Sequence, residues 1–137
     1  MIYLDTAALV KLLRPEPESD ALADWLDDRM DTLLVTSTLT EVELPRALRR
    51  IDPALLPQVP QLLERLARHE IDGAVRTAAA AYDGTELRSL DAIHLATAQV
   101  VLGSRITAFV TYDRRLLLAG ANLGMPVASP GAATREP

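Results

Sequence analysis

The sequence contains no cysteine and only two histidines, His69 and His94. A disulfide framework, a thiolate metal site and a cysteine nucleophile are therefore excluded, and zinc is disfavoured because cysteine and histidine are its usual ligands. Aromatic residues make up only 4% of the chain, so the core has to consist of Leu, Ala, Val and Ile. No apolar run approaches the length of a membrane span, and no secretory signal is recognisable. We expect a soluble, cytoplasmic protein without membrane contact.

Lysine is almost absent, since Lys11 is the only lysine among the 14 basic residues. The formal net charge of −5 argues against a nucleic-acid partner, although a local basic patch can still bind phosphate on an acidic protein. The planar guanidinium of arginine suits both phosphate and carboxylate groups. The arginine-rich composition therefore leaves an anionic ligand and internal ion pairs both open.

The 137 residues are enough for one domain with a real core and too few for two. We expect a single domain over residues 1–130 and a flexible C-terminal tail over 131–137. The apolar patterns predict strands and helices in alternation, which indicates an α/β fold with a parallel sheet covered on both faces. The expected strands are 2–5, 32–37, 70–72, 107–113 and a weak fifth from Met125; the expected helices are 6–13, 17–29, 39–51, 53–69, 74–82 and 89–102.

Four acidic residues lie at the ends of predicted strands or near the starts of predicted helices. Asp5 and Asp113 end the first and fourth strands, Asp91 lies in the first turn of a helix, and Glu43 lies early in another. In open parallel sheets, ligands bind beyond the carboxyl ends of the strands, where the strand order reverses. If the first and fourth strands are neighbours there, the four carboxylates converge at one edge.

Converging carboxylates without a thiol or histidine cluster are typical of a site for a hard divalent cation, Mg²⁺ or Mn²⁺. Such a site supports metal-assisted phosphoryl chemistry. Each acid also has a simpler interpretation. Asp5 could be a helix N-cap, Asp91 could complement a helix dipole, Asp113 could open a turn, and Glu43 could be a solvated helix residue.

Two further groups of residues are open to a functional or a structural interpretation. His94 shares a helix face with Asp91, and a packing or hydrogen-bonding role is favoured over that of a general base. A basic run after Glu43 is usually a solvated helix face, but it could contact RNA phosphates. This run and the arginines that could extend it are Arg46, Arg49, Arg50, Arg14, Arg88, Arg114 and Arg115.

Five stretches of the chain together resemble PIN-domain proteins, specifically the VapC toxins of VapBC toxin–antitoxin pairs. They are MIYLDTAALVKLL, TSTLTEVELPRALRR, LRSLDAIHLATA, FVTYDRRLL and GMPVASPG, in the family's order. The resemblance implies a three-layer α/β/α fold with strand order 3-2-1-4-5. It also implies a Mg²⁺- or Mn²⁺-dependent endoribonuclease toxin of a type II system, which cleaves RNA such as tRNA or rRNA loops. A cognate VapB antitoxin would inhibit it, and homodimers would assemble with that antitoxin.

The family's catalytic acids fall on Asp5, Glu43, Asp91 and Asp113, with the metal held by Asp5, Asp91 and Asp113. Motif spacing selects Glu43 over Glu41, and Thr38 to Glu41 reads as a capping box that gives Glu41 a structural role. Pro45 predicts a kink or a shortened first turn in the helix that carries Glu43.

Two other interpretations stay open: a catalytically silent PIN-fold binding module and a different metal-dependent phosphoryl hydrolase. A phosphatase of the haloacid dehalogenase type fits poorly because Ala7 stands where its second aspartate is expected.

Overall fold

The computed structural model describes residues 1–133, so the last four residues of the predicted tail lie outside the described residues. Five strands form one parallel sheet in the order β3-β2-β1-β4-β5, as the resemblance implied. Their bounds are Ile2–Leu4 for β1, Leu34–Ser37 for β2, Ala67–His69 for β3, Ala108–Val110 for β4 and Val127–Ala128 for β5.

Seven α-helices connect these strands within the described residues. They are α1 Thr6–Leu13, α2 Ser19–Asp27, α3 Thr40–Ile51, α4 Val59–Glu64, α5 Gly73–Ala81, α6 Ser89–Thr97 and α7 Arg114–Asn122. A 3₁₀-helix (Pro53–Gln58) precedes α4, while a π-helical turn (Ala98–Leu102) and a short 3₁₀-helix (Gly103–Arg105) follow α6. None of these helices is long and apolar enough to cross a membrane.

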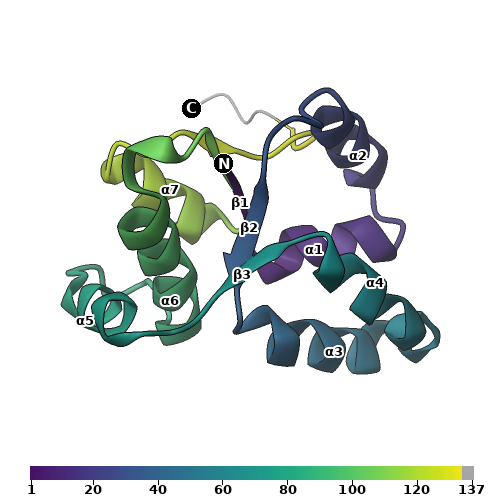
Figure 1. Ribbon diagram of the computed structural model, residues 1–137, viewed down its shortest axis with the longest axis horizontal. Coiled ribbons are helices and arrows are strands. Elements are labelled where there is room, and N and C mark those ends of the chain that lie inside the picture. Colours follow the sequence, from purple (N-terminus) through teal and green to yellow (C-terminus); the bar gives the residue numbers. More distant parts are fainter. Residues whose placement is uncertain (134–137) are drawn as a thin grey trace.

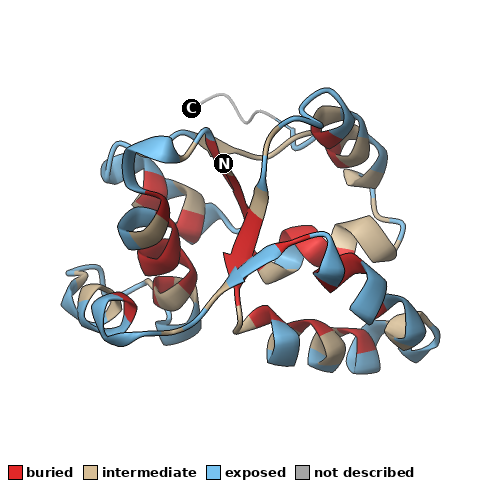
Figure 2. Cartoon of the chain, viewed as in Figure 1, coloured by how far each residue is buried: buried red, intermediate tan, exposed pale blue. Residues whose placement is uncertain are grey.

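The helices cover both faces of the sheet, which gives the predicted three layers (Figure 1). Along β1, Ile2 and Leu4 pack into one apolar cluster with α1 to α4, whereas Tyr3 packs into a second cluster with α6 and α7. This split follows from the two-residue repeat of a strand. Figure 2 shows that buried residues run along β1 and β2 and along the inner sides of the helices.

Several predicted boundaries were wrong. The third strand is 67–69 rather than 70–72, because its register pairs Val35 with Ala67 and Ser37 with His69. Ala67 and Arg68 are exposed at the sheet edge, so this strand leaves no apolar signal in the sequence. The helix predicted to run to His69 ends at Glu64, and the fourth strand is shortened to 108–110.

Two helices also differ in detail from the prediction. The helix α3 continues through Pro45 as a single element, although proline removes one intrahelical hydrogen bond there. The predicted helix 89–102 is α-helical only to Thr97 and then widens into the π-helical turn. Ser89 is the first residue of α6 rather than its N-cap, and no side chain caps this helix.

Candidate active site

Asp5 lies immediately after β1 and is the N-cap of α1. Its Oδ1 accepts the Ala8 amide at 2.9 Å, and its Oδ2 accepts the hydroxyl of Thr111, which follows β4. Asp5 is only 4% exposed, so these two donors replace much of the lost hydration of its carboxylate. Asp5 is therefore a helix cap, as the simpler interpretation proposed, and its position at the sheet edge is compatible with a second role.

Glu43 lies in the first turn of α3 and reaches back toward α1 and α6. Its Oε1 accepts two side-chain hydrogen bonds, from Thr6 Oγ1 at 2.7 Å and from His94 Nε2 at 2.7 Å. Because α3 covers one face of the sheet and α6 the other, the bond to His94 joins the two helical layers (Figure 1).

Asp91 and Asp113 also stand at the starts of helices. Asp91 lies in the first turn of α6 and is half-buried. Asp113 is the N-cap of α7, where its Oδ1 accepts the amides of Arg115 at 2.9 Å and Leu116 at 3.1 Å. Backbone amides at a helix N-terminus stabilise negative charge. All four predicted acids thus lie at helix starts along the carboxyl edge of the sheet.

The four acids line one cavity of about 540 Å³. Two of the seven arginines considered as phosphate contacts, Arg50 and Arg88, line it as well. Arg114 and Arg115 line a separate hollow beside α7, and Arg14 lies 3.8 Å from Glu16. The complete lining is Asp5, Thr6, Ala7, Glu43, Arg50, Arg88, Ser89, Leu90, Asp91, His94 and Asp113.

The pKa values of two acids are raised by their surroundings. Burial raises the pKa of Asp5, and the charge of Asp91 adds to this effect, although His94 and the hydrogen bonds to Asp5 act in the opposite direction. Burial likewise raises the pKa of Asp91, and the charges of Asp113 and Glu43 raise it further. The carboxylates are therefore close enough to repel one another.

Glu43 shows the opposite shift. Its partial burial alone would raise its pKa, but the hydrogen bonds from His94 and Thr6 outweigh burial and lower it. Glu43 is consequently held in its ionised form. Ionisation of Asp5 and Asp91 is instead disfavoured by their burial and by the neighbouring carboxylates. Opposite shifts within one cavity are a common mark of a functional site.

The donor set suits a hard divalent cation in an open site. Within residues 1–133, no three acidic or imidazole groups stand close enough together to enclose a metal ion. Mg²⁺ is usually held by one or two carboxylates with water and substrate phosphates completing its shell, so a closed protein cage is not required. Burial is the main reason that the pKa values of Asp5 and Asp91 are raised, and a cation would relieve the mutual repulsion that adds to it.

Comparisons with known proteins decide the family. Residues 2–121 match the PIN domain family model. Ribonuclease VapC35 of Mycobacterium tuberculosis is 60% identical over 135 residues, which cover 97% of this chain and 99% of the relative. The chain belongs to the VapC family of PIN-domain proteins. Ribonuclease VapC47 of the same species is 43% identical to this VapC-family chain, over 96% of the chain and 98% of the relative.

Solved structures show the same fold at lower identity. A toxin–antitoxin complex from Klebsiella pneumoniae contains a chain with a TM-score of 0.67 and 21% identity, over 94% of this chain and 96% of that one. The crystal structure of FitAcB from Neisseria gonorrhoeae gives a TM-score of 0.68 and 23% identity, over 95% and 98%. The VapC fold is thus matched over nearly the whole chain.

The predicted capping box of the VapC chain was wrong. The helix α3 has Leu39 at its N-cap, without a side-chain cap, and Glu41 instead makes an ion pair of 3.2 Å with Arg68 on β3. Glu41 still has a structural role, since its partner lies on the edge strand and it does not line the acidic cavity. Glu43 does line the cavity, as the motif spacing indicated.

Sequence reasoning missed a buried pair behind Glu43. The Tyr3 hydroxyl lies 2.6 Å from His94 Nδ1, and the opposite ring nitrogen of His94 contacts Glu43. His94 was expected to pack or to hydrogen-bond, which is confirmed, but neither its partners nor the role of Tyr3 was predicted. A tyrosine in an otherwise aliphatic strand, MIYL, was the available signal, since buried tyrosines usually need a partner for the hydroxyl.

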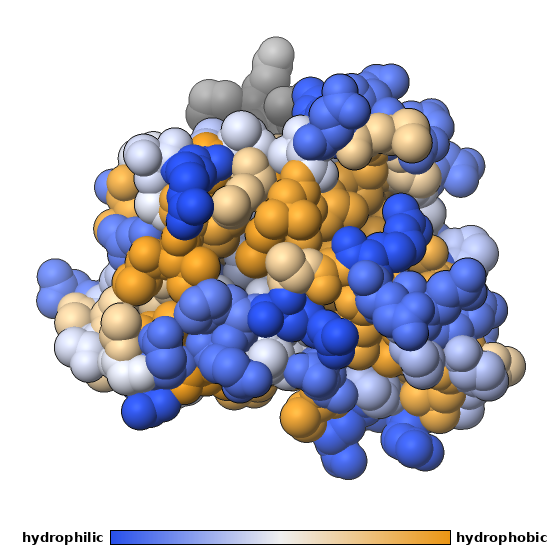
Figure 3. All heavy atoms as spheres, in the orientation of Figure 1, coloured by the Kyte–Doolittle hydropathy of each residue, from blue (hydrophilic) through white to orange (hydrophobic). Residues whose placement is uncertain are grey.

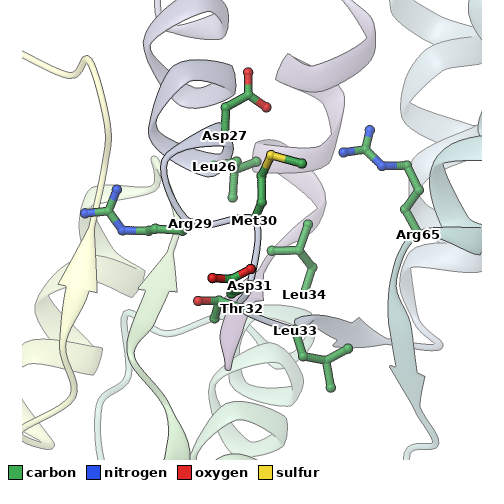
Figure 4. A pocket seen from close by; sticks show the side chains of 9 residues that line it. All are labelled: Leu26, Asp27, Arg29, Met30, Asp31, Thr32, Leu33, Leu34 and Arg65. Carbon is green, nitrogen blue, oxygen red and sulfur yellow. The ribbon is translucent and has the colours of Figure 1, made fainter.

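A second cavity of about 520 Å³ lies at the amino edge of the sheet, where β2 begins. Figure 4 shows its side chains, with Met30 between the arginines at positions 29 and 65 in this view. In Figure 3, apolar atoms reach the surface at the upper centre, near the start of β2 in Figure 1. The lining is Leu26, Asp27, Arg29, Met30, Asp31, Thr32, Leu33, Leu34 and Arg65.

Proposed function

We propose that this VapC chain is a Mg²⁺- or Mn²⁺-dependent endoribonuclease toxin. The observation that carries the proposal is the convergence of Asp5, Glu43, Asp91 and Asp113 on one cavity, in a chain that is 60% identical to a ribonuclease. A divalent cation bound there supplies a Lewis acid that polarises a phosphodiester and lowers the pKa of water.

Each acid has a separate task in this proposal. Asp5, Asp91 and Asp113 would hold the cation, directly or through its bound water, as in an open site; Asp5 and Asp113 are fixed by helix-start amides, and Asp91 stands in the first turn of α6. The ionised Glu43 accepts a hydrogen bond from the attacking water and orients it toward phosphorus. Its lowered pKa suits this task, because only the ionised carboxylate is a pure acceptor.

Arg50 and Arg88 are proposed to bind the RNA backbone. Both line the same cavity as the acids, from α3 and from the residue before α6. A guanidinium donates to two phosphate oxygens at once, so the pair would hold a phosphate beside the carboxylates despite the net charge of −5. The scarcity of exposed aromatic residues argues that backbone contacts, rather than base stacking, dominate affinity.

The proposed partners are RNA and an antitoxin of the VapB type. One solved relative is a toxin–antitoxin complex, which supports a protein inhibitor for this chain. We further propose a homodimer that joins the antitoxin in a larger hetero-oligomer.

The function is tested by incubating purified protein with total RNA and Mg²⁺ or Mn²⁺, with EDTA as the control. Cleavage is expected with either metal and should stop in EDTA. If Asp5→Asn cleaves as fast as the wild type with its metal content unchanged, the assignment is wrong. If expression is toxic and remains toxic in Asp5→Asn, the silent binding module is the better interpretation.

A further inference from the structure

We propose that Tyr3 and His94 are positioning residues that fix one oxygen of Glu43 and leave the other free to face both the bound cation and the attacking water. This inference rests on the proposed function and deepens it. It assigns a role to two side chains that lie behind the acids.

The Tyr3–His94 pair is buried and rigidly packed. Tyr3 is fully buried on β1, and His94 is 2% exposed on α6. The phenol ring stacks on Phe109 of β4 with centroids 5.3 Å apart, and it meets the imidazole edge-on at 5.8 Å. The Tyr3 ring belongs to the second apolar cluster, so it cannot rotate without disturbing that packing and it presents its hydroxyl to His94 from a fixed position.

The chemistry of the pair fixes the direction of its hydrogen bonds. An ionised carboxylate only accepts hydrogen bonds, so the His94 imidazole has to carry a proton at Nε2, the atom that faces Glu43. In the neutral tautomer with its proton on Nε2, the imidazole leaves Nδ1 to accept from the Tyr3 hydroxyl at 2.6 Å. The Nε2–H in turn donates to Glu43 Oε1 at 2.7 Å.

The consequence for Glu43 is that both side-chain donors fall on the same oxygen. Thr6 and His94 donate to Oε1, while Oε2 has no hydrogen-bond partner among the described residues. A free glutamate side chain would lose rotamer entropy on being ordered by a ligand. The hydrogen bonds to Oε1 order the carboxylate before a ligand binds, which lowers the entropic cost of binding.

The same bond sets the distance between acids that belong to different layers. His94 lies one helical turn after Asp91 on α6, and it holds Glu43 of α3 from across the sheet edge. Without this bond, the positions of Asp91 and Glu43 would depend only on the packing of two separate apolar clusters.

The variant Tyr3→Phe distinguishes a positioning role of the Tyr3–His94 pair from a purely structural one. This change removes only the phenol oxygen, which does not line the cavity. The positioning role predicts that kcat and the affinity for Mn²⁺ each fall about tenfold, with KM for RNA unchanged. Tyr82→Phe is the matched control, because it removes a phenol hydroxyl that bonds Gln99 outside the cavity. A structural role would lower only the thermal unfolding midpoint.

A second variant separates the hydrogen bond from the bulk of the ring. In His94→Gln, the side-chain amide can still donate to Glu43, so part of the activity and of the Mn²⁺ affinity should return relative to His94→Ala. His69→Gln is the control, since the His69 imidazole bonds the Glu70 carbonyl and does not line the acidic cavity. If Tyr3→Phe does not fold, this series still tests the inference. Equal losses in His94→Gln and His94→Ala would contradict it.

The closing experiment does not depend on catalysis. Nitrogen NMR of the imidazoles is practical because the chain has only two histidines. We expect His94 to be protonated at Nε2 in the wild-type protein and calorimetry with Mn²⁺ alone to show weaker binding in Tyr3→Phe. A neutral His94 with its proton on Nδ1, or unchanged Mn²⁺ affinity, overturns the inference even if RNA is cleaved. If both expectations are met but no RNA is cleaved, the proposed function fails and the positioning role stands.

Discussion

The two edges of the parallel sheet carry cavities of nearly equal volume, about 540 Å³ at the carboxyl edge and about 520 Å³ at the amino edge. Volume therefore does not distinguish them. At the carboxyl edge, α1, α3, α6 and α7 all begin and place acids beside their N-terminal amides. At the amino edge, the cavity is formed by the end of α2 and the loop into β2, with exposed side chains such as Met30 and Arg29.

This comparison shows that the acids gather at one edge because of the direction of the parallel strands, and not because a cavity is present there. Parallel strands followed by helices direct every helix N-terminus to the same edge, where the backbone favours negative charge. Arg29 at the other edge instead lies over the Trp25 ring at 3.9 Å and donates to the Trp25 carbonyl, so it is engaged in local structure.

The largest expected difference between the edges comes from removing one carboxylate charge. Asp91→Asn should lower the rate of RNA cleavage by about 10²-fold or more, because a positioned charge at the reaction centre is lost. The matched change at the amino edge, Asp31→Asn, should leave the rate unchanged. Initial rates on a fluorogenic RNA at saturating Mn²⁺ measure both, and equal effects of the two variants would remove the functional distinction between the cavities.

A smaller difference is expected between the arginines of the two edges. Arg50→Ala should raise KM for RNA roughly tenfold and reduce the salt dependence of binding by about one charge. Arg65→Ala, which alters the amino-edge cavity, should change neither quantity. Binding titrations at several salt concentrations check this, and an unchanged salt slope in Arg50→Ala would exclude a phosphate contact.

Replacing Asp5 by asparagine should lower the activity but maintain or raise the free energy of unfolding. The folded-state pKa of Asp5 is raised, so the folded protein binds more protons than the unfolded chain, and the free energy of unfolding falls as pH rises through the folded pKa. In EDTA, Asp5→Asn should therefore match the wild type within about 0.5 kcal/mol or exceed it, with an advantage that grows with pH. Asparagine retains an oxygen to cap α1.

Urea unfolding of both proteins from about pH 4 to about pH 8 measures this difference. A loss of more than about 2 kcal/mol in the variant would mean that Asp5 serves chiefly as a helix cap.

The smallest effect is expected at the amino-edge cavity itself. Met30 is 83% exposed, so Met30→Ser should change the free energy of unfolding by no more than about 0.5 kcal/mol and leave RNA cleavage unaffected. Chemical denaturation and the same RNA assay check it. A clear loss of activity would show that the amino edge takes part in the reaction.

The alternating α/β architecture could be predicted from local patterns, whereas the strand order and the set of four acids that line the cavity followed from the resemblance to VapC toxins. Strand–helix alternation fixes a parallel sheet, and an acid that follows a strand is visible in MIYLD and TYD. The third strand was misplaced because an edge strand with exposed Ala67 and Arg68 has no apolar repeat. The capping box failed because Glu41 found a partner, Arg68, that is distant in sequence. The hydrogen bonds that connect Tyr3, His94 and Glu43 could not be predicted for the same reason, since they join residues separated by 91 and 51 positions.

The pairing of β1 with β4 has a consequence for synthesis. Residues 2–4 pair with residues 108–110, and the acids of the cavity are spread from position 5 to position 113. A ribosome has to translate almost the whole domain before the first strand meets its second neighbour. Every shorter nascent chain lacks both Asp113 and the Thr111 hydroxyl that holds Asp5. Translation thus delays the assembly of the acidic cavity until β4 has been made.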